Sequence, residues 1–414
     1  MMGERMAGQE ALFYGFSLEQ HIPDNHLLRS IDRFVELSSI RQDLRDFYSS
    51  TGRPSVDPEL MIRMLIVGYC LGIRSERRLC EEVHLNLAYR WFCRLGLEGQ
   101  VPDHSTFSKN RHGRFRDSDV LRHVFEETVR RCLKEGLIGG EDFVVDASLI
   151  KADANRQRGV PGTEGHGSLS PTRAVREYID VLDDAAFGGA TQVTPKFISP
   201  ADPAARWTAA QGGQAFFAYS TNYLIDLDNA VIVDVEPSTA IRQAEVTATK
   251  SMLERTAQTF GLDPVRLAAN TAYGSAEMLS WLVHEQGIEP HIPVFDKSAR
   301  RDGTFSREDF HYDHEGDVYV CPEGKTLRTK GTLVNDGARD MARDIAKTDA
   351  YVVSRRQRKK VEMLFAHLKR ILKLDRLRLR GPTGARDEFL LAATAQNLRK
   401  LAKLIPMPQP EPAN

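Results

Sequence analysis

The chain has 414 residues, 41% of them hydrophobic and 27% charged, so two to three domains are expected at roughly 150 residues per domain. The 56 Lys and Arg residues nearly balance 57 Asp and Glu residues, and this overall balance indicates neither a polyanionic nor a polycationic partner. Five cysteines without a Cys-x-x-Cys pair fit neither a disulfide framework nor an evident zinc site, which predicts reduced thiols and a cytoplasmic protein. We expect no signal peptide and no membrane span, because the longest uncharged apolar runs are too short.

Residues 1–138 are predicted to form a helical domain. Asp57 and Pro58 are typical of a helix start, and Gly72 is typical of the exit from that helix. Further helices are expected at 75–84, 87–95 and 118–135. This succession of short helices is typical of helix-turn-helix domains, although many other all-helical domains share it.

From residue 139 to residue 296 strands alternate with helices. The expected elements are a strand at 143–150, a loop at 158–171, a helix at 172–185, strands at 215–225 and 230–235 joined by a hairpin turn, a helix at 243–261, a strand at 265–270, a helix at 275–287 and a strand at 289–294. This order predicts a mixed α/β sheet.

The remaining residues divide into three segments. Residues 297–345 are polar and irregular, with strand-like pieces near Tyr312 and at 318–320, and are interpreted as an insertion. Residues 346–404 contain two predicted helices, one from Thr348 past Leu372 and one over 387–404. Residues 405–414 are rich in proline and are predicted to be disordered.

Charge is unevenly distributed along this near-neutral chain. Residues 351–380 contain eleven Lys or Arg and only two acids, Glu362 and Asp375. Such a basic block favours binding to a nucleic-acid backbone through counterion release. A solvated helix face explains it equally well.

Two isolated carboxylates are candidates for chemistry. Asp146 lies within an apolar strand, where a charge is costly unless it is paired or binds a metal; a strand-end aspartate that caps a turn is equally plausible. Glu362 lies at the margin of an apolar helical stripe, and Arg358 and Lys369 share its face. A structural ion pair between Glu362 and Arg358 explains this arrangement as well as a catalytic role does.

Taken together, three motifs resemble the DDE transposases of bacterial insertion sequences. They are Val144–Ser148, the strand-to-turn run Ala268–Ser275 and the signature Arg358-x3-Glu362-x6-Lys369. Arg53-Pro54-Ser55-x-Asp57-Pro58 and Asp103-His104-Ser105-Thr106-Phe107 are similar to the helical domain that precedes the core in that group. The resemblance extends from about His21 to Leu404. It implies an RNase H-like mixed sheet core with an insertion, preceded by an all-α, helix-turn-helix-like domain that binds DNA.

The resemblance also implies the chemistry. Asp146, the residue at position 270 and Glu362 would bind Mg²⁺ or Mn²⁺ and catalyse cleavage and transfer of double-stranded DNA at transposon ends, since hard divalent cations prefer carboxylate oxygens. The partners would be the transposon ends and the target DNA, with a homodimer in a synaptic complex and a bacterial, nucleoid-associated location. DNA-backbone contacts are expected from five cations: Arg355, Arg358, Lys359, Lys369 and Arg370.

The chain departs from the family pattern in two places. Asn270 occupies the second acidic position, so the predicted site loses one negative charge; Asp226, Asp228 or Asp234 is a remote substitute. The segment after Cys321 lacks the cysteines that relatives often carry, which predicts a shortened insertion and no zinc. We therefore expect impaired strand cleavage. The alternatives are a catalytically inactive DNA-binding relic and an RNase H-like nuclease without strand transfer.

Arginines also recur in the helical domain. They are Arg77, Arg78, Arg90, Arg94, Arg111, Arg114 and Arg116. Either a DNA-binding face or ordinary solvated surface would account for them.

Overall fold

The computed structural model describes residues 15–49, 51–52, 55–163, 172–182, 195–209, 213–294, 305, 309–313, 318–328 and 336–407. It forms two compact units, one of Met1–Val120 with Leu398–Asn414 and one of Leu121–Asn397. Several predictions fall wholly or partly outside the described residues: Arg53 and Pro54, most of the loop at 158–171, much of the insertion and the end of the C-terminal tail. The domain limits drawn from the sequence stay a prediction.

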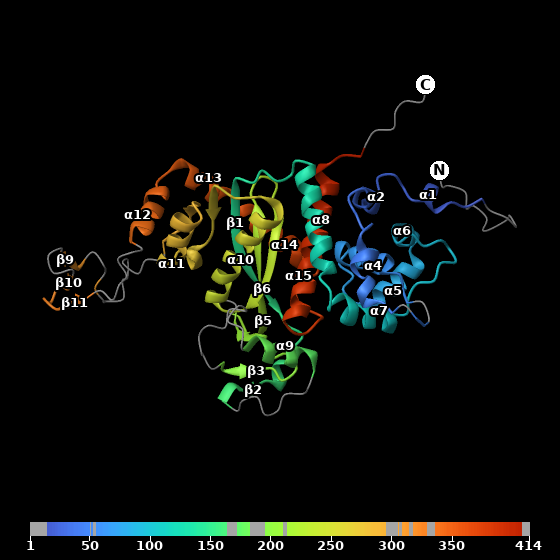
Figure 1. Cartoon of the computed structure of the whole chain (residues 1–414), viewed down its shortest axis with the longest axis horizontal. Coiled ribbons are helices and arrows are strands. Elements are labelled where there is room, and N and C mark those ends of the chain that lie inside the picture. Colours follow the sequence, from blue (N-terminus) through green and yellow to red (C-terminus); the bar gives the residue numbers. More distant parts are fainter. Residues whose placement is uncertain are drawn as a thin grey trace, which may run out of the picture. The chain divides into compact units, whose positions relative to one another are not determined.

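The first unit is built from short helices around one buried helix (Figure 1). That helix, α4 (Pro58–Cys70), begins where the Asp57 side chain accepts a hydrogen bond from Glu59 N, and Gly72 follows its end with φ +71°. Its neighbours are α1 (Leu18–His21), α2 (Leu27–Asp32), α3 (Ile40–Asp43), α5 (Glu76–Leu85), α6 (Leu87–Phe92) and α7 (His104–Asn110).

The second unit contains a mixed sheet in the order β4-β5-β1-β7-β8, with β6 also paired to β5. Its strands are β1 (Asp142–Lys151), β4 (Arg206–Thr208), β5 (Phe216–Asp226), β6 (Val231–Thr239), β7 (Arg266–Ala268) and β8 (Glu289–His291). β5 runs antiparallel to β1, β4 and β6, whereas β1, β7 and β8 run parallel. This arrangement confirms the predicted RNase H-like mixed sheet core.

Helices cover both faces of the sheet. The Tyr223 ring of β5 lies 5.7 Å from Phe365 of α14 (Lys359–Arg370). Ser220, also on β5, donates to Glu245 of α10 (Arg242–Phe260) over 2.7 Å. Successive strand side chains point to opposite faces, so α14 and α10 lie on opposite faces of the sheet.

The other elements of the chain complete this scaffold. They are α8 (Val120–Lys134), α9 (Arg173–Leu182), α11 (Ala276–Ser280), α12 (Asp336–Ile345), α13 (Asp349–Gln357), α15 (Pro382–Leu404), the β2 (Val160–Pro161) and β3 (Phe197–Ile198) pair, and a sheet of β9 (His311–Asp313), β10 (Val318–Val320) and β11 (Thr326–Arg328). Short 3₁₀ or π turns lie at Arg45–Phe47, Arg111–Phe115, Arg156–Arg158, Thr271–Tyr273 and Trp281–Glu285.

Two helix predictions near the C-terminus were wrong. The helix expected from Thr348 past Leu372 is broken at Arg358 into α13 and α14, and it ends at Arg370. The last helix begins at Pro382, five residues earlier than expected. Proline is well suited to the first turn of a helix, which accounts for the early start.

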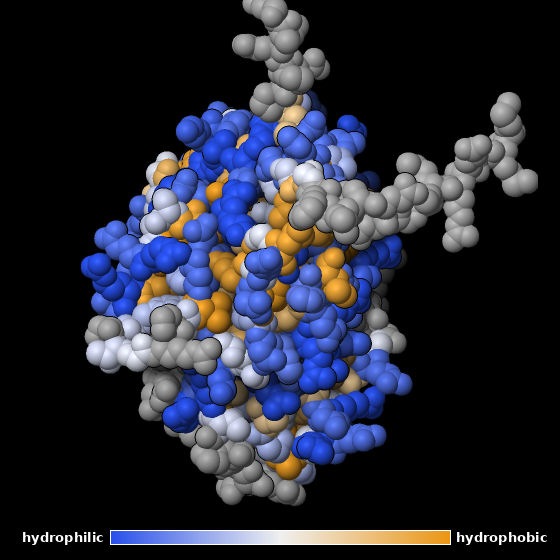
Figure 2. Space-filling model, turned by 90° about the vertical axis from the view of Figure 1, so that its right-hand side faces the viewer, coloured by the Kyte–Doolittle hydropathy of each residue, from blue (hydrophilic) through white to orange (hydrophobic). Residues whose placement is uncertain are grey.

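The surface is mostly hydrophilic on the face shown in Figure 2, with smaller hydrophobic areas between the polar side chains. Within the described part of the chain, no helix has both the length and the apolar character needed to cross a membrane.

Candidate active site

Asp146 and Asn270 lie at the same level on neighbouring strands. The parallel pairing of β1 with β7 ends at Val144 opposite Ala268, and each of the two polar residues follows its strand's last pair by two positions. Neighbouring strands are about 4.8 Å apart, so this register brings the two side chains together. The Asn270 amide nitrogen Nδ2 donates to Asp146 Oδ1 over 3.3 Å.

The orientation of the Asn270 amide follows from a second contact. Its oxygen Oδ1 accepts from Ala272 N over 2.7 Å and caps the 3₁₀ turn Thr271–Tyr273. Turning the amide over would place its NH₂ group against a backbone N–H, so the nitrogen is the atom that faces Asp146. Asn270 therefore caps a turn and bonds the candidate catalytic carboxylate at once.

The Asp146 carboxylate is half-buried. Burial raises its pKa, and the negative charge of Glu362 raises it further, whereas hydrogen bonds from Ala147 N and Asn270 and the charge of Arg358 oppose the shift. Residues from three distant segments of the sequence thus act on the Asp146 carboxylate.

Glu362 projects from α14 and is exposed. Its carboxylate makes no hydrogen bond or ion pair within the described ranges, and the interpretation of a structural ion pair with Arg358 was wrong. Arg358 instead donates through Nη1 to Ala269 O over 3.1 Å, next to Asn270. The break between α13 and α14 falls at Arg358 itself.

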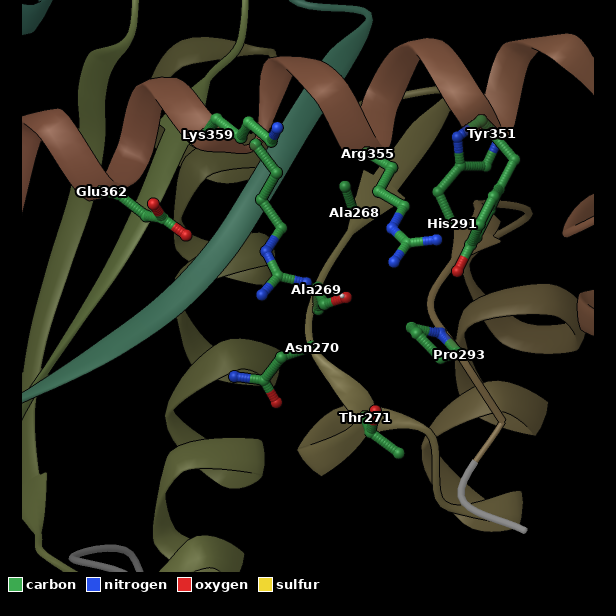
Figure 3. A pocket seen from close by; sticks show the side chains of 11 residues that line it. Ala268, Ala269, Asn270, Thr271, His291, Pro293, Tyr351, Arg355, Lys359 and Glu362 are labelled. Atoms are coloured by element: carbon green, nitrogen blue, oxygen red, sulfur yellow. Dashed lines mark hydrogen bonds between the residues drawn. The ribbon is translucent and has the colours of Figure 1, made fainter. Parts of the chain in front are cut away.

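A cleft of about 530 Å³ lies beside these residues, lined by the end of β7, by β8 and by α13 and α14. Figure 3 shows Glu362 and Lys359 projecting from one helix, with Asn270 on the loop across from them. Arg355 also lines the cleft, so three of the five cations predicted to contact DNA line it: Arg355, Arg358 and Lys359.

The far side of this cleft contains two residues that sequence reasoning missed. His291 is buried at the end of β8, and its Nδ1 lies 2.7 Å from Ser354 Oγ on α13. Tyr351 packs beside it, with ring centroids 5.9 Å apart. The only sequence signal was the position of His291 at a strand end, which is a common place for ligand-binding groups in such sheets.

The other predicted cations lie outside this cleft. Lys369 and Arg370 are in the last turn of α14, away from the lining residues, and burial lowers the pKa of Lys369. Lys360, which belongs to the same basic block, donates to Leu227 O over 2.9 Å and closes the β5–β6 hairpin. The block is therefore divided between cleft, surface and structural positions.

The carboxylates considered as substitutes for Asn270 have other roles. Asp226 accepts hydrogen bonds from Gly139 N and Gly140 N, both over 3.0 Å. Asp234 is buried and bonds Arg122 over 2.6 Å and Arg255 over 2.8 Å. The structure gives neither of them a contact with Asp146.

Three of the seven arginines considered in the helical unit are buried, so the interpretation as a DNA-binding or solvated face was wrong for those three; Arg77, Arg78 and Arg94 are exposed, as a solvated surface predicts. Arg90, Arg111 and Arg116 are buried. Arg111 donates to Tyr69 Oη over 2.8 Å and to Glu76 over 2.9 Å. Arg78, Arg94 and Arg114 have partners on Glu82, on Asp32, and on Phe47 O with Ser55. Arg77 is exposed beside His104.

The donor set fits a divalent cation poorly. Among the described residues, Glu362 is the carboxylate whose charge acts on Asp146, and Asn270 presents an N–H group to Asp146 rather than an oxygen. Across the described residues, no cluster of three or more His, Cys, Asp or Glu side chains could hold a metal. At position 270, where a third oxygen ligand is expected, the Asn270 side chain donates a hydrogen bond to Asp146 instead.

Comparison with known proteins identifies two matching family models. Residues 16–113 match a transposase domain (DUF772), and residues 139–398, more than half of the chain, match a transposase DDE domain. No curated protein matches. Among solved structures, the chain is similar to a cryo-EM structure of a piggyBac transposase synaptic complex with hairpin DNA, at 10% identity and a TM-score of 0.34, over 92% of this chain and 75% of the other.

Proposed function

The chain belongs to the transposase DDE family and is a transposase of the insertion-sequence type, and we propose that it binds double-stranded DNA at transposon ends while its strand cleavage is impaired. The observation that carries this proposal is the hydrogen bond from Asn270 Nδ2 to Asp146 Oδ1. It joins two positions that, in the family pattern, would both carry carboxylates.

The members of this family generally use a divalent metal, and in this chain Mg²⁺ or Mn²⁺ would have two carboxylates to bind, those of Asp146 and Glu362. A neutral amide that donates a hydrogen bond to one of them removes a negative charge and occupies an acceptor site of that carboxylate. Hard cations bind more weakly as the number of charged oxygen ligands falls. The proposal therefore expects low metal affinity rather than a different metal.

We propose that the chain binds DNA even with Asn270 in place of a carboxylate. Arg355, Arg358 and Lys359 line the cleft beside the two carboxylates, and arginine and lysine are the side chains that neutralise phosphates. Lys369 is assigned to the DNA backbone from the family signature alone, and Arg370 from its place in the basic block. A second copy of the chain in a synaptic complex, a target duplex as partner and a bacterial cytoplasmic location belong to the same proposal. The buried cysteines Cys70, Cys80, Cys93 and Cys132 are in the reduced form, which supports that location.

The test is a cleavage assay on a supercoiled plasmid carrying the DNA ends that flank the reading frame, with Mg²⁺ or Mn²⁺. The matched control is Asn270→Asp, which restores the family pattern with almost no change of shape. We expect the variant to cleave at least about tenfold faster, the lower end of what changes around a metal ligand cause. Equal cleavage by the two proteins would overturn the proposal.

A gel-shift assay on the same end fragment separates the alternatives. Retained binding with no product from either protein favours a catalytically inactive DNA-binding relic. Nicked but unjoined products favour a nuclease without strand transfer. No binding by either protein contradicts the proposed function.

A further inference from the structure

A second group of cations lies at the far end of β1 from the cleft. After α14 ends, the chain reverses at Lys373, whose φ is +57°. From there to Arg380 leucines alternate with arginines: Leu377 and Leu379 are buried, whereas three arginines between and beside them are exposed. These are Arg376, Arg378 and Arg380. Together with Lys151 at the end of β1, we call them the basic cluster.

The backbone beneath the basic cluster is firmly held. Leu377 N donates to Lys151 O over 2.8 Å, which attaches the segment to the end of β1. Arg378 N and Leu379 N both donate to Oε1 of Glu388, each over 2.5 Å. Glu388 is fully buried on α15, so a buried side chain holds the backbone that carries these arginines.

Two of the arginines are held in place by one carboxylate. Asp153 accepts from Arg376 Nη2 over 2.9 Å and from Arg380 Nε over 3.0 Å. Both arginine side chains stay about half exposed, at 49% and 50%. Arg378 is exposed, and in the described part of the chain its side chain has no hydrogen-bond or ion-pair partner.

We infer that the basic cluster binds the phosphate backbone of duplex DNA outside the catalytic cleft. The four cations of the basic cluster outnumber Asp153, which binds two of them, and Asp375 of the same segment, so positive charge is in excess on this surface. Guanidinium groups suit phosphate oxygens geometrically, and arginines already ordered by Asp153 lose less side-chain entropy on binding. An anionic partner is the complement of this surface.

The basic cluster lies at the end of the strand that carries Asp146; the odd spacing puts the Lys151 and Asp146 side chains on opposite faces of the sheet, so a duplex at the cleft would contact the cluster around the end of that strand. Lys151 follows Asp146 by five residues on one strand, a separation of about 17 Å at 3.3–3.4 Å per residue. That corresponds to roughly five base pairs at 3.4 Å each. The inference rests on the proposed function, because it assumes that DNA lies at the cleft, and it adds a contact surface outside the family signature.

The test measures binding of the full chain to a fluorescently labelled 30-base-pair duplex of arbitrary sequence, by anisotropy over a series of KCl concentrations. Arg378→Ala should weaken binding several-fold and reduce the slope of log affinity against log salt by about 0.9, the change for one lost phosphate contact. Arg378→Glu should weaken it further.

The matched control is Arg130→Ala, a surface arginine of the same unit whose partners are Glu126 and Glu127 on α8; its slope should equal that of the wild type. A slope unchanged in both Arg378 variants would overturn the inference while leaving the proposed function standing. Weaker binding accompanied by a lower Tm for Arg378→Ala would show a structural role and overturn it too. A wild type that fails to bind the duplex at low salt would refute the inference and the proposed function together.

Discussion

The exchange Asn270→Asp tests whether a hydrogen bond has taken the place of a metal ion at this site. The new carboxylate keeps the cap on Ala272 N but places an oxygen, instead of Nδ2, against Asp146 Oδ1. Losing a hydrogen bond to a charged group and adding a like charge beside Asp146 should cost about 1–3 kcal/mol when no cation is present. Since Asp146 already has a raised pKa, part of that cost is relieved by proton uptake.

The assay is thermal unfolding in EDTA and in MnCl₂ or MgCl₂. In EDTA the variant should unfold several degrees below the wild type, at 2–4 °C per kcal/mol for a domain of 150–250 residues. A cation at about 100 times its Kd should restore about 2.7 kcal/mol, which would return the variant to the wild-type Tm or above it. The wild type should respond little to either cation.

Two controls make the result specific. Asn270→Ala loses the cap and the hydrogen bond without adding a carboxylate, so it should be destabilised with no rescue by metal. Glu362→Gln in the Asn270→Asp background should reduce the rescue, because it removes another oxygen charge. The reasoning is refuted if the wild type gains as much stability from the cation as the variant does.

Three further predictions concern stability. Arg111→Ala removes the buried partner of the half-buried Glu76 carboxylate and should cost about 3 kcal/mol in urea unfolding; a stable variant with weaker DNA binding would contradict the structural role. Asn397→Ala should cost about 1–3 kcal/mol, because the Asn397 side chain bonds both Ile232 N and Ile232 O on β6, and an unchanged urea midpoint would argue against it. Burial raises the pKa of Asp202 to about 6, so its neutral form stabilises the fold below pH 3.8 and that stabilisation is lost as pH rises through 6; Asp202→Asn should therefore gain on the order of 3 kcal/mol relative to the wild type between pH 4 and pH 8, and a pH-independent difference would refute this.

The strands of the core were predictable because their apolar runs are local signals. The predicted limits of β1, β5 and α10 agree with the structure to within one or two residues. The pairing of Asp146 with position 270 could be expected as soon as a parallel sheet was inferred, since strand ends of one direction meet at one edge. These features depend on periodicity and turn chemistry alone.

The break at Arg358 could not be predicted because its causes lie elsewhere in the chain. The apolar positions of α14 continue the helical period of the preceding segment, so local pattern favours one helix. The contacts around the break are the Arg358 bond to Ala269 O and the contact between Ser354 and His291. Both partners are more than 60 residues away in sequence, and such tertiary contacts override local propensity.

The arginines of the helical unit show that the role of a charged side chain also cannot be predicted from the local sequence. A count of basic residues cannot separate a solvated arginine from a buried one, because the deciding carboxylate is distant in sequence. Arg63 bonds Asp32 over 2.8 Å, 31 residues away, and Arg111 bonds Glu76, 35 residues away. Burial converts these cations into structural elements of the fold, whereas Arg378, with a similar local sequence context, stays exposed.

An amide in place of a carboxylate at position 270 affects the stability of the fold and the binding of a metal in opposite directions. A cluster of carboxylates without a cation repels itself and lowers the stability of the fold that contains it. In this chain the Asn270 amide caps its turn and donates to Asp146, so the strand edge is satisfied without any metal. The surfaces proposed to hold DNA depend on that scaffold and on arginines anchored elsewhere. The proposed impairment of metal binding is therefore compatible with an intact fold and with DNA binding.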